Sequence, residues 1–176
     1  MKTIFLLLLA SLAVLLFARH QMSNLMVTGE VVCFEFIGTT HKADSTLSHP
    51  AWIIADTVYN QAHHLSPGMT KTERLRVNTY WDFLFIIGYV CSLMFLGCLL
   101  LGPDNRLMFY ISRLLVVVGC LDALENVCLL RILVGGRSIF PAAMWGFAAV
   151  KFSLLGISVV LIIAGIALRL LKKPIQ

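Results

Sequence analysis

The fold is decided by residues 80–101, which read YWDFLFIIGYVCSLMFLGCLLL and carry a single charged side chain, Asp82. A stretch of about 20 mostly apolar residues is the length that an α-helix needs to cross a bilayer. Thr70 and Glu73 precede this stretch at the spacing of an N-terminal capping box. We therefore predict one helix over residues 70–101, about 48 Å long, whose first turns stand above the membrane.

The composition of the whole chain agrees with a membrane protein. Of 176 residues, 59% are hydrophobic and only 13% are charged, and the mean hydropathy is +0.88. Soluble domains contain about 25% charged residues, so an ordinary soluble domain, a disordered tail and a nucleic-acid arm are excluded. The net charge is +5, but the basic residues flank apolar segments instead of forming a stripe. We therefore expect no nucleic-acid partner.

An apolar run at the N-terminus predicts a second membrane segment. Residues 3–18 follow Lys2 and precede Arg19, which is the pattern of a signal anchor or a signal peptide. Cleavage after Ala18 would place Leu16 where a small residue is preferred, so we favour a retained anchor. The run is about 24 Å long as a helix, which is short of the ~30 Å hydrocarbon core.

Two more apolar runs complete the set of spanning segments. One covers residues 107–134 and the other extends to about residue 168. Gly135 and Gly136 are expected to end the third helix, and Ser138 to cap the start of the fourth.

These runs predict an all-α membrane protein, a four-transmembrane-helix bundle with an extracytoplasmic cap segment between helices 1 and 2. The assignment is residues 1–20 for the first transmembrane helix, 21–79 for the cap, 80–171 for transmembrane helices 2–4 and 172–176 for a cytoplasmic tail. The signal-like N-terminus and the basic tail predict that the N- and C-termini of this multi-pass protein are both cytoplasmic.

The cap is too rich in apolar residues for a linker. Thr40 is expected to cap a short helix over residues 41–47. Residues 50–62 contain Trp52 and Tyr59, which suit the membrane interface, so we predict one in-plane helix there.

Polar side chains inside the apolar runs are the most informative feature. They are Asp82 in the second span, Asp122, Glu125 and Asn126 in the third, and Lys151 in the fourth. An ionisable residue at mid-bilayer costs about 2.5 kcal/mol or more unless it is paired or hydrated, so we expect these side chains to face the bundle interior. Three carboxylates in one apolar enclosure need compensation, either from Lys151 or from a proton that one carboxyl holds.

Helical spacing predicts that these side chains meet. Asp122, Glu125 and Asn126 stand at i, i+3 and i+4 and share one helix face. Asp82 and Tyr89 share one face of the second span by the same periodicity. We therefore predict a shared polar cluster in the outer half of the bundle.

The cap offers one more candidate for this cluster. Glu35 lies between Phe34 and Phe36, and a loop that folds over the bundle mouth would bring Glu35 to the cluster. The cluster has three interpretations: a structural network that fixes helix register, a site for a ligand or partner, and a catalytic or proton-relay site.

Three short strings carry a resemblance. They are WDFLFI at residues 81–86 with Tyr89, DALEN at residues 122–126, and FEF at residues 34–36 followed by Gly38-Thr39. Together they resemble a group of small, uncharacterised bacterial multi-pass membrane proteins. The resemblance implies a bacterial envelope location. It also implies that one functional set is formed by Glu35, Asp82, Asp122, Glu125 and Asn126.

We predict a non-enzymatic integral membrane protein that binds a lipid-like or amphipathic ligand, or acts as an accessory subunit of a membrane complex, through the polar cluster. The alternative is an intramembrane enzyme (a hydrolase or a metal-assisted enzyme) or a proton-coupled carrier that uses the same carboxylates. The expected partners are the lipid bilayer, a lipid-like ligand, and a membrane-protein partner or a second copy of the chain.

Two further expectations concern metals and helix contacts. The histidines lie outside the spans at no zinc-binding spacing, so neither a metal nor a cofactor is predicted. A small-residue surface on the fourth helix would permit close contact between helices, through Gly146, Ala149, Gly156 and Gly165.

Overall fold

The computed structural model describes residues 1–25, 36–136 and 139–171, and every regular element in these ranges is a helix. The long helices among them are α1 (Lys2–Ser23), α6 (Lys71–Leu101), α7 (Arg106–Leu133) and α8 (Phe140–Leu171). Each of these helices is long and apolar enough to cross a membrane. The predicted all-α bundle of four spanning helices is therefore confirmed.

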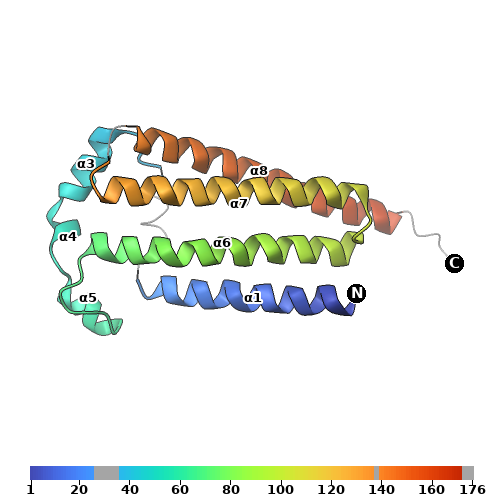
Figure 1. The fold of residues 1–176 in the computed structure, drawn as a ribbon, viewed down its shortest axis with the longest axis horizontal. Coiled ribbons are helices and arrows are strands. Elements are labelled where there is room, and N and C mark those ends of the chain that lie inside the picture. The colour runs from blue at the N-terminus through green and yellow to red at the C-terminus, as the bar shows by residue number, and fades with distance from the viewer. Residues whose placement is uncertain (26–35, 137–138, 172–176) are drawn as a thin grey trace.

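Each long helix packs against the long helix that follows it in the chain. α1 packs on α6, α6 on α7, and α7 on α8, and α8 also touches α6. Figure 1 shows α1, α6 and α7 side by side, with α8 inclined to them. Three short helices, α3 (Thr40–Ser48), α4 (Pro50–Ile53) and α5 (Thr57–Ala62), lie at one end of the bundle, and the N-terminus lies at the other.

Local signals explain where the long helices begin and end. The capping box of α6 is present, since the Glu73 N–H donates to Thr70 Oγ1 at 3.2 Å and the Thr70 N–H donates to Glu73 Oε2 at 2.8 Å. Gly102 ends α6 with a φ of 93° that glycine adopts without strain. Asn105 then caps α7 by accepting the Leu107 N–H at 2.9 Å.

The first helix is longer than the sequence predicted. α1 continues through Arg19 to Ser23, a run of 22 residues that is about 33 Å long and matches the hydrocarbon core. The length of the apolar run underestimates the length of α1, because a helix does not have to end where the hydrophobic residues end. No helix-breaking residue occurs before Asn24.

Two predictions for the cap were wrong in detail. Thr39, not Thr40, caps α3 by accepting the Lys42 N–H at 3.3 Å. The single in-plane helix is two short helices, because the backbone is extended at Ile54 and Asp56 starts a new helix by accepting the Tyr59 N–H at 2.9 Å. Trp52 is buried beneath Lys71, whose Nζ lies 4.7 Å from the ring centroid. The predicted cap at Ser138 falls outside the described residues.

Apolar side chains pack in two separate clusters, one at each end of the bundle. The cluster at the cap end includes Leu47, Trp52, Leu75, Leu129, Ile132 and Met144. The cluster at the opposite end comprises Leu101, Met108, Ile111, Leu115 and Ile162. Many other large apolar side chains point outward from the long helices, as lipid contact requires. The polar side chains of the spans lie between the two clusters.

Small residues hold α1 against α6. A Cβ atom added to Gly88 would lie 2.8 Å from the Cα and N atoms of Leu15, so the two backbones approach closely. One turn further on, Ser92 Oγ donates to Ser11 Oγ at 3.0 Å. Gly88 and Ser92 form the small-xxx-small pattern of close helix pairs in membranes.

The small-residue surface predicted on the fourth helix plays little part inside the chain. Of the three glycines in the predicted set, all in the described ranges, only Gly165 makes a close approach, where an added Cβ would lie 2.9 Å from Leu101 Cδ2. Gly146 and Gly156 face open space. The close helix contact lies on α6, at the seam with α1.

We expect Gly88→Ala to destabilise the protein by about 1–3 kcal/mol, because the added methyl group meets backbone atoms that cannot move aside. Gly156→Ala is the matched control, since it faces open space and gains up to ~1 kcal/mol of helix propensity. Thermal unfolding of both variants in detergent measures the difference. Equal melting temperatures for the two variants would contradict the close α1–α6 packing.

Candidate functional site

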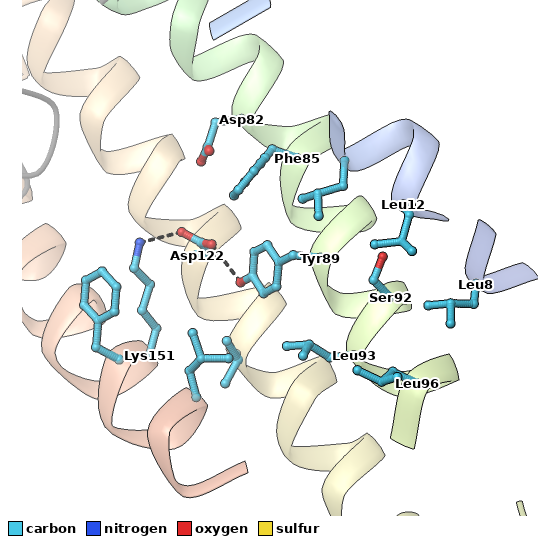
Figure 2. Close-up of a pocket in the computed structure, with 14 residues that line it drawn as sticks. Leu8, Leu12, Asp82, Phe85, Tyr89, Ser92, Leu93, Leu96, Asp122 and Lys151 are labelled. Atoms are coloured by element: carbon cyan, nitrogen blue, oxygen red, sulfur yellow. Dashed lines mark hydrogen bonds and ion pairs between the residues drawn. The ribbon is translucent and has the colours of Figure 1, made fainter. Parts of the chain in front are cut away.

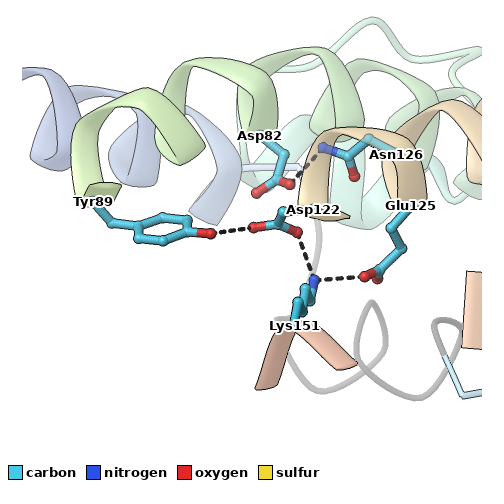
Figure 3. Close-up of polar contacts among 6 residues, drawn as sticks. All are labelled: Asp82, Tyr89, Asp122, Glu125, Asn126 and Lys151. Atoms are coloured by element: carbon cyan, nitrogen blue, oxygen red, sulfur yellow. Dashed lines mark hydrogen bonds and ion pairs between the residues drawn. The ribbon is translucent and has the colours of Figure 1, made fainter. Parts of the chain in front are cut away.

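Polar side chains from three of the long helices meet between the two apolar clusters (Figure 3). The members of this polar network are Asp82 and Tyr89 from α6, Asp122, Glu125 and Asn126 from α7, and Lys151 from α8. The structure therefore brings together the side chains that were predicted to meet.

Lys151 lies between two carboxylates of α7. Its Nζ is 2.6 Å from Asp122 Oδ1 and 2.8 Å from Glu125 Oε2. The side chains of Lys151, Asp122 and Glu125 expose only 8%, 10% and 2% of their surface. A buried charge is tolerated when an opposite charge and hydrogen bonds compensate its lost hydration. These ion pairs therefore fix the register of α8 against α7.

Two hydrogen bonds between side chains join α6 to α7. Tyr89 Oη donates to Asp122 Oδ2 at 2.8 Å, and Asn126 Nδ2 donates to Asp82 Oδ2 at 2.7 Å. The helices are antiparallel, so the later residue of α6 pairs with the earlier residue of α7. Asp122 accepts hydrogen bonds from both Tyr89 and Lys151 and is the centre of the network.

The network lies deep in the bundle, nearer to the cap than to the opposite end. Asp122 is about 24 Å from the start of α7 at Arg106 and about 17 Å from its end at Leu133, by the rise of the helix. The described members carry three carboxyl groups and one ammonium group. Either bound protons or a further cation must balance the remaining negative charge.

A cavity of about 560 Å³ lies beside the network (Figure 2). All four long helices line it, so it is a feature of the whole bundle. Its polar side chains are Asp82, Tyr89, Ser92, Asp122 and Lys151. Its apolar side chains are Leu8, Leu12, Leu15, Phe85, Leu93, Leu96, Val118, Phe152 and Leu155.

The cavity has a polar end and an apolar end. Along α6 it extends from Asp82, on the cap side, to Leu96, a distance of about 21 Å. Leu8, Leu12 and Leu15 form its wall on α1, while α8 contributes the facing wall. These residues belong to the helices that are long and apolar enough to cross a membrane, so the cavity lies within the spanning part of the bundle.

Glu35, the remaining candidate of the sequence, falls outside the described residues. The residue that follows it, Phe36, stacks on Phe152 of α8 with ring centroids 6.1 Å apart. Phe152 lines the cavity, and Lys151 Nζ lies 4.9 Å from its ring centroid. The described start of the cap at residue 36 therefore touches a wall of the cavity.

The sequence did not reveal the cavity. Its α1 wall comes from a run in which Ser11 is the one polar residue between residues 4 and 18. Ser11 stands three residues after Leu8 and four before Leu15, so it was the one signal for this face. Ser92 was also missed, although its spacing of four residues from Gly88 is a recognisable signal for a close helix pair.

Comparison with protein-family models, curated proteins and solved structures finds no match to this chain. In the described ranges, no three His, Cys, Asp or Glu side chains are grouped to hold a metal ion.

We expect Lys151→Met to destabilise the protein by about 3–5 kcal/mol, because it leaves Asp122 and Glu125 buried without their cation. Unfolding in detergent, followed by circular dichroism, measures the loss. Lys42→Met, at an exposed position of α3, is the control and should change stability little.

A compensated variant separates charge from packing. Adding Asp122→Asn and Glu125→Gln to Lys151→Met removes the unpaired carboxylates and should restore part of the lost stability. A Lys151→Met protein as stable as the wild type would show that the ion pairs do not hold α8.

Proposed function

We propose that this protein binds one amphipathic, lipid-like molecule in the cavity between its four spanning helices. The cavity carries this proposal, because it joins leucine-lined walls to a buried polar network at one end. Its volume of about 560 Å³ falls within the range of roughly 300–1,000 Å³ of small-molecule sites. The polar part of the ligand contacts Asp82 and Asp122, and the apolar part lies along α1 toward Leu8.

The cavity favours ligand binding over a purely structural or accessory role. Hydrogen bonds such as Asn126–Asp82 are sufficient to set helix register, and register alone requires no open volume. In a tightly packed bundle, apolar side chains would fill the space beside Tyr89. The polar ends of Asp82 and Asp122 instead line a cavity, where they are available to a bound molecule.

We expect Leu12→Trp to abolish retention of the ligand, because the larger ring fills the apolar part of the cavity. Native mass spectrometry of protein extracted gently from its own membrane shows whether a small molecule is retained. Leu16→Trp is the matched control, since Leu16 is on the same helix but is exposed on its outer surface. Equal retention by the two variants would contradict binding in this cavity.

We further propose that the protein resides in the bacterial inner membrane with both termini in the cytoplasm and the cap outside. The basic start of the chain at Lys2 and the basic flank at Arg169, Lys172 and Lys173 support this orientation. In the fold, the N-terminus and the end of α8 lie at the same end of the bundle, away from α3–α5.

The orientation is tested with reporters fused after Gln176 in a bacterial host. Green fluorescent protein fused there should fluoresce, because it folds in the cytoplasm, and alkaline phosphatase fused there should be inactive. The same phosphatase inserted at Gly68, in the cap, should be active. The opposite pattern would reverse the proposed orientation.

A further inference from the structure

We infer that the ligand of the cavity is an amphipathic amine, whose protonated amino group lies against Asp82 and Asp122. This inference rests on the proposed function and adds the chemistry of the ligand's polar end. It follows from the charge of the network, from the direction of its hydrogen bonds and from the aromatic rings beside it.

The charge of the network favours a cation. Among the described residues that line the cavity, Asp82 and Asp122 bring two carboxyl groups, and Lys151 brings one ammonium group. Electrostatic attraction is far stronger in an apolar enclosure than in water. A ligand with one positive charge therefore balances the network better than a neutral ligand. A ligand with a negative charge adds to the imbalance.

The hydrogen bonds of the network also favour a donor. Lys151, Tyr89 and Asn126 already donate to the carboxylates. An anionic headgroup would compete with Asp122 and Glu125 for the positive charge of Lys151. A protonated amine instead donates to carboxylate oxygens that line the cavity and leaves the existing contacts in place.

Aromatic rings border the polar end of the cavity. Phe85 and Tyr89 of α6 line it with ring centroids 5.8 Å apart, and Phe152 lines it from α8. The faces of aromatic rings attract cations, and this attraction is larger where water is excluded. Together with the leucines of α1, these rings suit a positively charged group attached to a hydrocarbon chain. Such an amine has two sources, a free lipophilic amine and the headgroup of an aminophospholipid.

Three probes with the same hydrocarbon chain test the headgroup. Dodecylamine, dodecanol and dodecanoate are titrated separately into the purified full-length protein in a neutral detergent at pH 8, and bound species are counted by native mass spectrometry. At this pH an alkylamine is protonated and a carboxylic acid is ionised. We expect dodecylamine to bind about tenfold more tightly than dodecanol, which corresponds to ~1.4 kcal/mol, and dodecanoate to bind most weakly.

Variants of Asp82 assign the preference to the network. Asp82→Asn keeps an acceptor for Asn126 but removes one charge, so the preference for the amine over the alcohol should fall severalfold. Asp82→Glu keeps the charge and should keep the preference. Asp104→Asn makes the same chemical change at an exposed position of the α6–α7 turn and should leave all three affinities unchanged. Comparing each probe between the wild type and a variant cancels the partitioning of that probe into detergent micelles.

A lipid experiment distinguishes the two sources of the amine. Protein in nanodiscs of mixed phosphatidylethanolamine and phosphatidylglycerol with identical acyl chains is released and weighed with its retained lipid. Retention of phosphatidylethanolamine identifies an aminophospholipid. Retention of neither lipid, with tight binding of dodecylamine, identifies a free lipophilic amine.

The outcomes separate failure of this inference from failure of the proposed function. If dodecanol or dodecanoate binds the wild type as tightly as dodecylamine, and Leu12→Trp abolishes that binding, the cavity is a lipid site but its ligand is not selected as an amine. If Leu12→Trp leaves the binding of every probe unchanged, the cavity is not the site and both proposals fail.

Discussion

The structure depends on one buried arrangement of charge, in which Lys151 lies between Asp122 and Glu125. An ammonium group without partners in this position would be strongly unfavourable, so α7 and α8 must keep the register that holds these side chains together. Asp122 also accepts a hydrogen bond from the Tyr89 hydroxyl, so the same carboxylate fixes the position of α6. The two apolar clusters then pack at the two ends of the helices, with the charged side chains between them.

Stability alone does not explain this arrangement. Replacing a buried ion pair with well-packed apolar side chains is often neutral or stabilising, so a bundle selected only for stability has little use for three carboxyl groups and a lysine in the membrane. The network is also not filled in by protein on every side. Asp82, Asp122 and Lys151 also line the cavity, and the cavity continues away from them along leucines of α1. A polar end joined to an apolar channel matches an amphipathic molecule.

The sequence predicted the features that local chemistry determines. The capping box at Thr70 and the glycine at residue 102 gave the ends of α6, and the spacing of Asp122, Glu125 and Asn126 predicted their common face. The structure adds their partners, because pairing depends on how helices are arranged in space. The cavity could not be predicted, since α1 is apolar on most sides and Ser11 alone marks its face toward α6. Trp52 suited the interface by residue type, but the packing of the cap on α6 buries it.

The position of α1 follows from a different kind of contact than the rest of the bundle. α6, α7 and α8 are joined by ion pairs and hydrogen bonds between charged or amide groups, whereas α1 packs chiefly on α6 through Gly88, Ser92 and Ser11. None of the network contacts described above involves α1, yet α1 supplies Leu8, Leu12 and Leu15 to the cavity. The polar end of the cavity is therefore fixed by the network, while its apolar wall is fixed by a small-residue seam. Movement of α1 along or away from that seam changes the space for a hydrocarbon chain without breaking the ion pairs of Lys151. In the proposed function, the bundle thus separates recognition of a polar group from accommodation of an apolar chain.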